Sequence, residues 1–322
     1  MSTCQLFLLL AKNIKNPSPA RSIITHMKNL KSTTQRDYAR RMLDVIAYIQ
    51  SHLDEDIQLE QLAGVACFSS YHFHRIFTGM MGQTLKKYIR QLKLQRAAED
   101  LIKTDRSVLD IALDAGYETH ESFTRAFGAM FGIAPQQFRN DNPSLNTLFS
   151  AKANVLKQLN ENSGDNDMNV EIVEFPQTKV AFVRHTGPYK DCGKAWETLC
   201  NWAGPNGMLQ PGCTFFGLCH DDPDVTDPDK IRYDACISID TDCQTEGQIQ
   251  IKSIQAGPYA KTTHFGPYDN LSKTYAKLCG QWIPEKGYEP DSKPSIEIYL
   301  NSPEDTDPKD LITDVYVPLV KE

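Results

Sequence analysis

One short segment near the C-terminus carries a carboxylate and a phenol at a spacing suited to binding a cation. Its apolar and polar side chains alternate, which predicts a strand with Ile296, Ile298 and Leu300 on one face. The other face carries Glu297 and Tyr299, which face a cleft if the apolar face packs on a helix. A carboxylate beside aromatic rings in a partly dry pocket selects hydrophobic cations through charge and cation–π attraction. The alternative is a solvated glutamate on an open sheet face.

Other residues that could do chemistry lack the spacing that the chemistry needs. His185 and His264 occupy matching positions of an internal repeat without an acidic or cysteine partner at ligand spacing, so both are interpreted as structural. The acidic run over 221–229 resembles a calcium loop only superficially, because Pro228 interrupts it and no glycine occupies the turn position. The sequence contains no glycine-rich phosphate loop and no serine hydrolase motif. We therefore expect no metal, no cofactor and no catalytic residue.

The cysteines and apolar runs bear on the compartment. The nine cysteines contain no CxxC pair, and their odd number gives little support to a disulfide framework. The longest apolar run, Leu6 to Ala11, has six residues, whereas a membrane-spanning helix needs about 20. No basic residue precedes that run, as one would in a signal peptide. We therefore expect a cytoplasmic protein with reduced thiols and no membrane partner.

The second half of the chain contains an internal repeat. Residues 181–200 and 260–279, which are offset by 79, share eight identities in 20 positions. Each unit is predicted to be a strand, a Gly-Pro-Tyr turn, a helix and two further strands. Two such units form an α+β fold whose joined sheets leave a cleft, where ligands usually bind. The units differ where Gly217 aligns with Glu297.

A different repeat marks the first half as helical. Apolar residues between Tyr38 and Phe138 recur every three or four positions, which is the helical period. A short helix, a tight turn and a second helix occur twice, as in two helix-turn-helix motifs. In each second helix the apolar residues are spaced for the core, and the others are expected to face outward. Five residues recur at an offset of 50: Phe73, Arg75, Phe77, Met80 and Gly82 return as Phe123, Arg125, Phe127, Met130 and Gly132.

Charge divides the 322 residues into two parts of opposite sign. The total of −7 would by itself argue against a nucleic-acid partner. Residues 1–167 nevertheless carry a net charge of +3, whereas residues 168–322 carry −10. The sequence therefore predicts two functional units, of which the basic one can bind nucleic acid.

These patterns predict four segments. They are a disordered leader over 1–35, a double helix-turn-helix domain over 36–140, a linker over 141–167 and an acidic α+β domain over 168–322. Met27 is a candidate for the true start, and a short helix is expected over Leu148 to Leu159. The predicted fold class is an all-α double helix-turn-helix domain followed by an α+β domain made of two repeated strand-helix-strand-strand units.

The helical half resembles the AraC family of transcriptional regulators over about Arg36 to Arg139. The motifs that carry the resemblance are Phe68-Ser69-x-Tyr71-x-Phe73-x-Arg75-x-Phe77, Leu109-Asp110-Ile111-Ala112-x-x-Ala115-Gly116-Tyr117 and Phe131-Gly132-x-x-Pro135-x-x-Phe138-Arg139. The resemblance implies a sequence-specific regulator that binds double-stranded promoter DNA, with its two second helices in successive major-groove segments. RNA polymerase is a further partner that the resemblance allows.

The same resemblance implies which side chains contact the DNA. They are Tyr71, His74 and Arg75 in the first motif and His120, Glu121, Thr124 and Arg125 in the second. Arginine can bind guanine with two hydrogen bonds, histidine can donate or accept at a base edge, and glutamate can accept from cytosine. The alternative for Arg75 and Arg125 is an ion pair inside the domain or a contact to phosphate alone.

The acidic half resembles the GyrI-like small-molecule-binding domain over about Val170 to Val320. The likeness lies in Gly266-Pro267-Tyr268, Trp282-x-Pro284, Arg232-Tyr233-Asp234-Ala235-Cys236 and Glu297-Ile298-Tyr299-Leu300. In that family an acidic residue in the pocket recognises drug-like cations. The likeness thus implies a small organic effector, cationic or amphiphilic, and a role in multidrug sensing. The ligand-binding residues that we expect are Glu297, Tyr299, Tyr268, Trp282, Phe182 and Tyr233.

Two other hypotheses treat the acidic half differently. As an enzyme it would hydrolyse a small molecule, with Glu297 and Tyr299 or Tyr268 positioning or activating a water. As an interaction module it would bind a protein partner or mimic DNA. The main prediction is a regulator that is not an enzyme. Its effector must bind the DNA-competent state with a different affinity, because uniform binding shifts no equilibrium.

Overall fold

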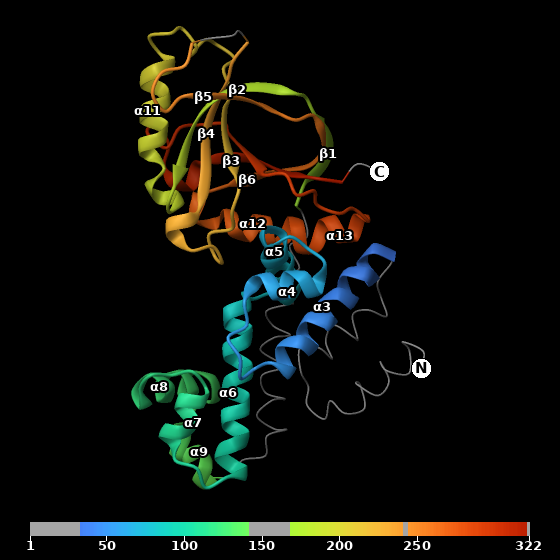
Figure 1. The fold of residues 1–322 in the computed structure, drawn as a ribbon, viewed down its shortest axis with the longest axis vertical. Helices are drawn as coiled ribbons and strands as arrows, with labels where there is room; N and C mark the ends of the chain where they lie inside the picture. The colour runs from blue at the N-terminus through green and yellow to red at the C-terminus, as the bar shows by residue number, and fades with distance from the viewer. Residues whose placement is uncertain (1–32, 142–167, 241–243, 321–322) are drawn as a thin grey trace. The chain divides into compact units, whose positions relative to one another are not determined.

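The computed structural model describes residues 33–141, 168–240 and 244–320, which form two compact units (Figure 1). The first unit contains residues 33–68 and 81–141, and the second contains residues 69–80 and 168–320. Each unit is described by itself below.

Some sequence-based expectations fall outside these residues. Met27 and the helix expected over Leu148 to Leu159 both lie outside the described residues. Within the part of the chain that the structure describes, no helix combines the length and the apolar character needed to cross a membrane.

The first unit is all-α. Its helices are α3 (Thr33–Ser51), α4 (Leu59–Ala66), α6 (Leu85–Lys103), α7 (Val108–Asp114), α8 (His120–Phe131) and α9 (Pro135–Asp141). Helix α5 (Ser70–Met81) follows α4 in the chain and belongs to the second unit. The predicted helical period is confirmed in α3, where Met42, Val45, Ile46 and Ile49 are buried.

Local sequence signals explain how α7 and α8 form a helix-turn-helix motif. The Ser107 hydroxyl caps α7 by accepting from Asp110 N at 3.0 Å, and Thr119 caps α8 by accepting from Ser122 N at 3.1 Å. Gly116 lies between the helices at a φ of 82°, a left-handed conformation that glycine adopts at little cost. Phe123 and Phe127 are fully buried in a cluster with apolar residues of α6, α7 and α9. The exposed face of α8 is therefore its polar face.

The second unit is built on one antiparallel sheet of eight strands. The strands are β1 (Val170–Phe175), β2 (Thr178–Thr186), β3 (Phe215–Cys219), β4 (Arg232–Ser238), β5 (Gln250–Ile254), β6 (Gly257–Phe265), β7 (Ser295–Tyr299) and β8 (Ile312–Pro318). The helical segments of this unit after β1 are η1 (Tyr189–Asp191), α11 (Gly193–Ala203), η2 (Pro228–Lys230), η3 (Tyr268–Asn270), α12 (Leu271–Lys277), η4 (Leu278–Trp282), α13 (Ile283–Lys286) and η5 (Pro308–Asp310).

The strand order reflects the predicted duplication. The order is β1-β6-β8-β7-β3-β4-β2-β5, and exchanging the equivalent strands of the two repeats gives the same order read from the other edge. The predicted strand-helix-strand-strand unit is confirmed, and one further strand, β1 or β5, precedes each unit. The two repeats join where β3 pairs with β7, and at that join Gly217 lies directly opposite Glu297.

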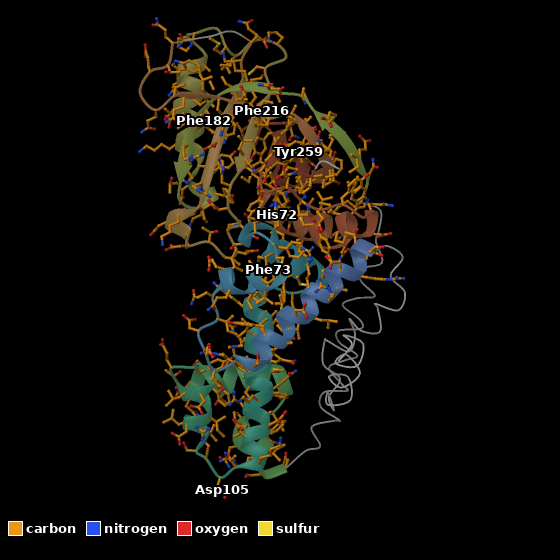
Figure 2. All side chains as sticks on the ribbon, turned by 45° about the vertical axis from the view of Figure 1, so that its right-hand side comes forward. His72, Phe73, Asp105, Phe182, Phe216 and Tyr259 are labelled. Carbon is orange, nitrogen blue, oxygen red and sulfur yellow. The ribbon has the colours of Figure 1, made fainter. Side chains whose placement is uncertain are left out.

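The two faces of the sheet carry separate cores. One face packs against α11 through Val183, Ala235 and Ile237, among others. The opposite face encloses an aromatic and aliphatic cluster that includes Phe182, Phe216 and Tyr259, which Figure 2 labels. Each core is thus formed by the strand side chains that point to its face of the sheet, which are every second residue along a strand.

Within the described part of the chain, the apolar face of β7 does not pack on a helix, so the condition set for Glu297 and Tyr299 to face a cleft is not met. Ile296 belongs to the helix-free cluster, and Ile298 packs against it. Strand β1 supplies Phe175 and Val173 to the same cluster, so this apolar face is covered by the sheet's own first strand. The helices lie on the face that carries Glu297. The predicted alternation of the strand is nevertheless confirmed.

A buried aspartate accepts hydrogen bonds from three basic side chains across the sheet. Asp234 has no exposed surface, and it accepts hydrogen bonds from Arg184 Nε at 2.7 Å, from His220 Nε2 at 2.8 Å and from Lys252 Nζ. Burial alone would raise the pKa of Asp234, but these donors hold it well below its usual range. The repeat equivalent, Asp314, accepts from Thr263 Oγ1 at 2.6 Å.

We predict that Asp234→Asn lowers the free energy of unfolding by about 1.5–3 kcal/mol at pH 7, the range for hydrogen bonds to a charged group. Because the pKa of Asp234 is depressed in the folded state, this stabilisation is complete above the unfolded pKa of about 3.9. It is lost as the pH falls further. Urea unfolding at a series of pH values measures the difference. Asp229→Asn, at an exposed position, is the control, and a difference between wild type and Asp234→Asn that stays constant down to about pH 2 contradicts the account.

Candidate functional site

A large cavity lies on the helix-bearing face of the second unit. Its volume is about 1570 Å³, and its lining includes residues of α11, α12, β3, β4 and β7. Small-molecule sites commonly measure about 300–1,000 Å³, so the cavity can hold an organic molecule of several rings. Seven of the lining side chains are large aromatics: Tyr189, Trp196, Phe215, Tyr233, Tyr268, Tyr275 and Tyr299.

The aromatic side chains contact one another around the cavity. The ring centroid of Tyr299 lies 5.9 Å from that of Trp196 and 5.5 Å from that of Tyr268, in edge-on geometry. Tyr189 and Tyr233 form a similar pair at 5.6 Å. Such pairs hold the ring faces in fixed directions. These rings give the cavity apolar surface, and the tyrosine hydroxyls add hydrogen-bonding groups to its lining.

Glu297 supplies a buried negative charge to this cavity. Its side chain lines the cavity although the residue is only 6% exposed. Tyr275 Oη donates to Glu297 Oε1 at 3.0 Å, and Tyr299 Oη donates to Glu297 Oε2 at 2.8 Å. Among the residues that the structure describes, no Lys, Arg or His forms an ion pair with Glu297. A buried carboxylate with donors but no countercharge favours a cation as its partner.

Gly217 makes room for this arrangement. A Cβ atom on Gly217 would lie 2.7 Å from Tyr233 Oη and would collide with Tyr299 Oη as well. The two hydroxyls lie 2.9 Å apart. Because Tyr299 donates its proton to Glu297, Tyr233 donates to Tyr299. The glycine of one repeat thus allows a chain of hydrogen bonds to the glutamate of the other.

The phenols around Glu297 keep their protons. Burial, and then the negative charge of Glu297, raise the pKa of Tyr275 and of Tyr299 well above the ordinary value. The same two causes, in the same order, raise the pKa of the Cys219 thiol. These groups therefore act as hydrogen-bond donors to the carboxylate at neutral pH, and Glu297 is the one negatively charged group among them.

Four of the six expected ligand-binding residues line the cavity: Glu297, Tyr299, Tyr268 and Tyr233. The expectation is wrong for Phe182 and Trp282 as lining residues. Phe182 points to the opposite face of the sheet, where Lys252 Nζ lies 4.1 Å from its ring centroid. Trp282 stacks on Tyr288 instead, with ring centroids 6.4 Å apart. The alternation of side chains along β2 explains why Phe182 does not line the cavity, because its position in the strand points to the opposite face of the sheet.

Sequence reasoning missed Tyr189, Trp196 and Tyr275, which the repeat could have revealed. Tyr189 is the equivalent of Tyr268 at the offset of 79, and Trp196 is the equivalent of Tyr275. All four line the cavity. The pseudo-symmetry of the sheet thus places equivalent aromatic residues on both sides of the join between β3 and β7.

The expected DNA-contacting residues occupy two different environments. On α8, His120, Glu121 and Arg125 are exposed and Thr124 is partly exposed. On α5, the expected core residues Phe73, Ile76 and Phe77 are fully buried. The expectation that the remaining α5 side chains face outward is wrong in this conformation, because His74 and Arg75 are 2% and 6% exposed.

The buried α5 residues contact other parts of the second unit. Arg75 lies 3.8 Å from a carboxylate oxygen of Asp222, and His74 Nδ1 donates to the same carboxylate at 3.1 Å. Tyr71 Oη accepts from Arg75 Nη1 at 2.7 Å. These contacts resemble the alternative foreseen for Arg75, an internal ion pair, and they leave the prediction of DNA contacts untested.

One group of side chains within the described residues has the composition of a metal site. His74, Asp222 and Asp224 can each bring one ligand atom within 4.8 Å of the others. Asp222, however, already accepts from His74 and lies beside the guanidinium of Arg75. A fixed positive charge at that distance repels a metal ion. The group therefore works as a polar contact of α5.

Two family models match the chain. Residues 168–320 match the GyrI-like small molecule binding domain, and residues 62–141 match a helix-turn-helix domain. The match to the second unit contains the cavity and Glu297. Together they define a protein class in which a helix-turn-helix part is joined to a small-molecule-binding part.

Relatives of known name match the helical half. The chain is 40% identical over 102 residues to the uncharacterized HTH-type transcriptional regulator YbfP of Bacillus subtilis, covering 32% of this chain and 35% of YbfP. It is 36% identical over 97 residues to the regulatory protein SoxS of Escherichia coli, covering 30% of this chain and 91% of SoxS. The chain thus spans about a third of YbfP and nearly all of SoxS. It belongs to the AraC family of DNA-binding transcriptional regulators and carries a GyrI-like domain.

One solved structure is similar to about half of this chain. It is the C-terminal domain of EcmrR, which is 22% identical and covers 48% of this chain and 99% of that chain, with a TM-score of 0.40.

Replacing Gly217 with alanine tests the crowding at the join of the two repeats. We expect Gly217→Ala to lower the free energy of unfolding by about 1–3 kcal/mol, because the added methyl group overpacks the two tyrosine hydroxyls. The measurement is urea unfolding followed by tryptophan fluorescence. Gly193→Ala is the matched control, since a Cβ there meets nothing within 4 Å. Equal stability of the two variants contradicts the crowding argument.

Proposed function

We propose that this regulator senses a hydrophobic organic cation, which binds in the cavity with its positive charge near Glu297. The observation that carries the proposal is the buried, hydrogen-bonded Glu297 carboxylate, which lacks a countercharge among the described residues and faces a cavity lined by aromatic rings. The GyrI-like family match supports a small-molecule ligand. The charge and hydrophobicity of that ligand are our inference from the site.

The proposed specificity follows from the cost of burying charge. A neutral ligand in this cavity would leave the Glu297 carboxylate without a countercharge in a dry environment. A cation compensates that charge and also contacts ring faces, where each cation–π contact contributes about 0.5–2 kcal/mol. A strongly hydrated cation without apolar surface would lose its water and gain little from the rings. The site therefore favours cations whose charge is spread over, or surrounded by, hydrocarbon.

On the DNA side, we propose that α8 reads bases of a double-stranded promoter. Its exposed His120, Glu121 and Arg125 extend from a helix whose opposite face is fixed by Phe123 and Phe127. An exposed polar helix of this kind enters the major groove in helix-turn-helix proteins. Such a protein acts where the chromosome lies, in the cytoplasm, and RNA polymerase is a further proposed partner.

Glu297→Gln tests the role of charge in the cavity. The substitution keeps the shape and the acceptor oxygen for one tyrosine while it removes the negative charge. We expect it to weaken benzyltrimethylammonium at least about tenfold, which corresponds to about 1.4 kcal/mol. Its uncharged carbon isostere, neopentylbenzene, should bind with nearly unchanged affinity. Isothermal titration calorimetry or quenching of tryptophan fluorescence measures both.

A matched control separates the local charge from the net charge. Glu304 lies at the exposed edge of the same cavity, so Glu304→Gln changes the total charge equally in a solvated place. We expect Glu304→Gln to change the affinity for the cation less than twofold, as exposed charges contribute little. If the wild type binds the cation and its neutral isostere equally well, a site selective for cations is ruled out.

Arg125→Ala tests base recognition by α8. If Arg125 binds a guanine, the variant should lose about 1–3 kcal/mol of affinity for a selected duplex and almost none for random DNA. Binding is measured by fluorescence anisotropy at fixed salt. Arg40→Ala is the charge-matched control, because Arg40 pairs with Asp37 within α3. An equal loss on selected and random DNA would mean that Arg125 contacts only phosphate.

A further inference from the structure

Helix α5 forms hydrogen bonds along its length with the rest of the second unit. His72 Nε2 donates to the carbonyl oxygen of Asp291 at 2.6 Å, near the start of the helix. Near its end, Gln281 Nε2 donates to the carbonyl oxygen of Gly79 at 3.1 Å. The contacts of His74 with Asp222 lie between these two. Seven of the 12 residues of α5, including His72, His74 and Arg75, are buried.

Two glycines allow α5 to approach the unit at backbone distance. A Cβ on Gly280 would lie 2.6 Å from Gly79 Cα and 2.8 Å from the carbonyl oxygen of Ile76, and its three nearest atoms all belong to α5. A Cβ on Gly79 would lie 2.8 Å from Gly280 Cα. Glycine pairs of this kind let helices cross in close contact. The close approach of α5 thus leaves no room for a side chain at position 280.

Arg75 connects α5 to the cavity carboxylate. Its guanidinium carbon lies 3.7 Å from the ring centroid of Tyr275 and 4.1 Å from that of Tyr71, between two aromatic faces. Tyr275 is the same residue that donates its hydroxyl proton to Glu297. Arg75 and His74 also line the cavity itself. The protein's own cation therefore occupies a place next to the site that we propose for a cationic ligand.

His74 and Arg75 cannot contact the GyrI-like domain and DNA at the same time. A helix that reads DNA must present its polar side chains to base edges in the major groove, whereas His74 and Arg75 are enclosed here. We propose that this surface of the GyrI-like domain holds α5 in a docked, DNA-incompetent state, and that a cation in the cavity weakens the docking. The inference rests on the proposed function for the nature of the effector.

The cavity chemistry gives the direction of the switch. A ligand cation near Glu297 places a second positive charge close to Arg75, and the two charges repel each other. The cation also compensates the negative charge of Glu297, which lies on the other side of Tyr275 from Arg75. It also fills space that α5 side chains line. Both effects favour the undocked state, so the effector binds that state more tightly and shifts the population toward it. The docked state leaves α8 exposed, and release of α5 adds a second DNA-reading helix.

Gly280→Ala in the full-length chain tests docking without removing any residue of the cavity or of α5. The DNA probe is a duplex selected from a random pool by the wild type in the presence of benzyltrimethylammonium. Without the cation, we expect the variant to bind this duplex about tenfold more tightly than the wild type, within the usual range of allosteric coupling. Its hydroxyl-radical footprint should be longer by about one helical turn, or about 10 base pairs. Added cation should then change its DNA affinity less than about twofold.

Two further variants keep the test decisive. Gln281→Ala removes only one exposed donor to Gly79 and should raise the affinity in the same direction by a smaller factor, even if Gly280→Ala folds poorly. Asp229→Asn, at an exposed position that does not line the cavity, should match the wild type. Wild-type affinity and footprint for both Gly280→Ala and Gln281→Ala would overturn the docking. If benzyltrimethylammonium binds no variant while Gly280→Ala still tightens DNA binding, the docking stands and the proposed effector class fails.

Discussion

The cavity of the second unit is organised around the buried carboxylate of Glu297, at the join of the two repeats. Strands β3 and β7 pair there, and the symmetric position holds glycine in one repeat and Glu297 in the other. A second carboxylate at Gly217 would place like charges side by side in a dry cavity, which is costly. A side chain there would also displace the tyrosine hydroxyls. The duplication therefore produces a cavity with aromatic residues from both repeats and a buried carboxylate at the join of β3 and β7.

Sequence patterns predicted much of this arrangement. The helical period located α3 and α8, the offset of 79 located the repeat, and alternation put Glu297 and Tyr299 on one face of β7. The same alternation could not show which face meets the helices, because both faces of the sheet are apolar. Ile296 packs inside the curl of the sheet with Phe175, a partner that is about 120 residues away in the chain. Contacts over such separations follow from topology, which a local pattern does not encode.

Helix α5 shows the same limit for the DNA-binding residues. Its amphipathic pattern correctly predicted that Phe73, Ile76 and Phe77 are buried. The pattern contains no signal that Arg75 meets Tyr275 or that His74 meets Asp222, because those partners lie in the other half of the sequence. The opposite signs of charge in the two halves are consistent with such contacts. The acidic half supplies the carboxylate that a basic residue of the DNA-binding motif contacts.

The central claim is that a cation at Glu297 and DNA at the helix-turn-helix motifs are energetically coupled. The most direct measurement is a reciprocal titration of the wild-type chain: DNA affinity with and without saturating benzyltrimethylammonium, and cation affinity with and without saturating DNA. The account predicts that each ligand raises the affinity for the other by the same factor, about tenfold. A cation that binds in the cavity yet leaves the DNA affinity unchanged would contradict it.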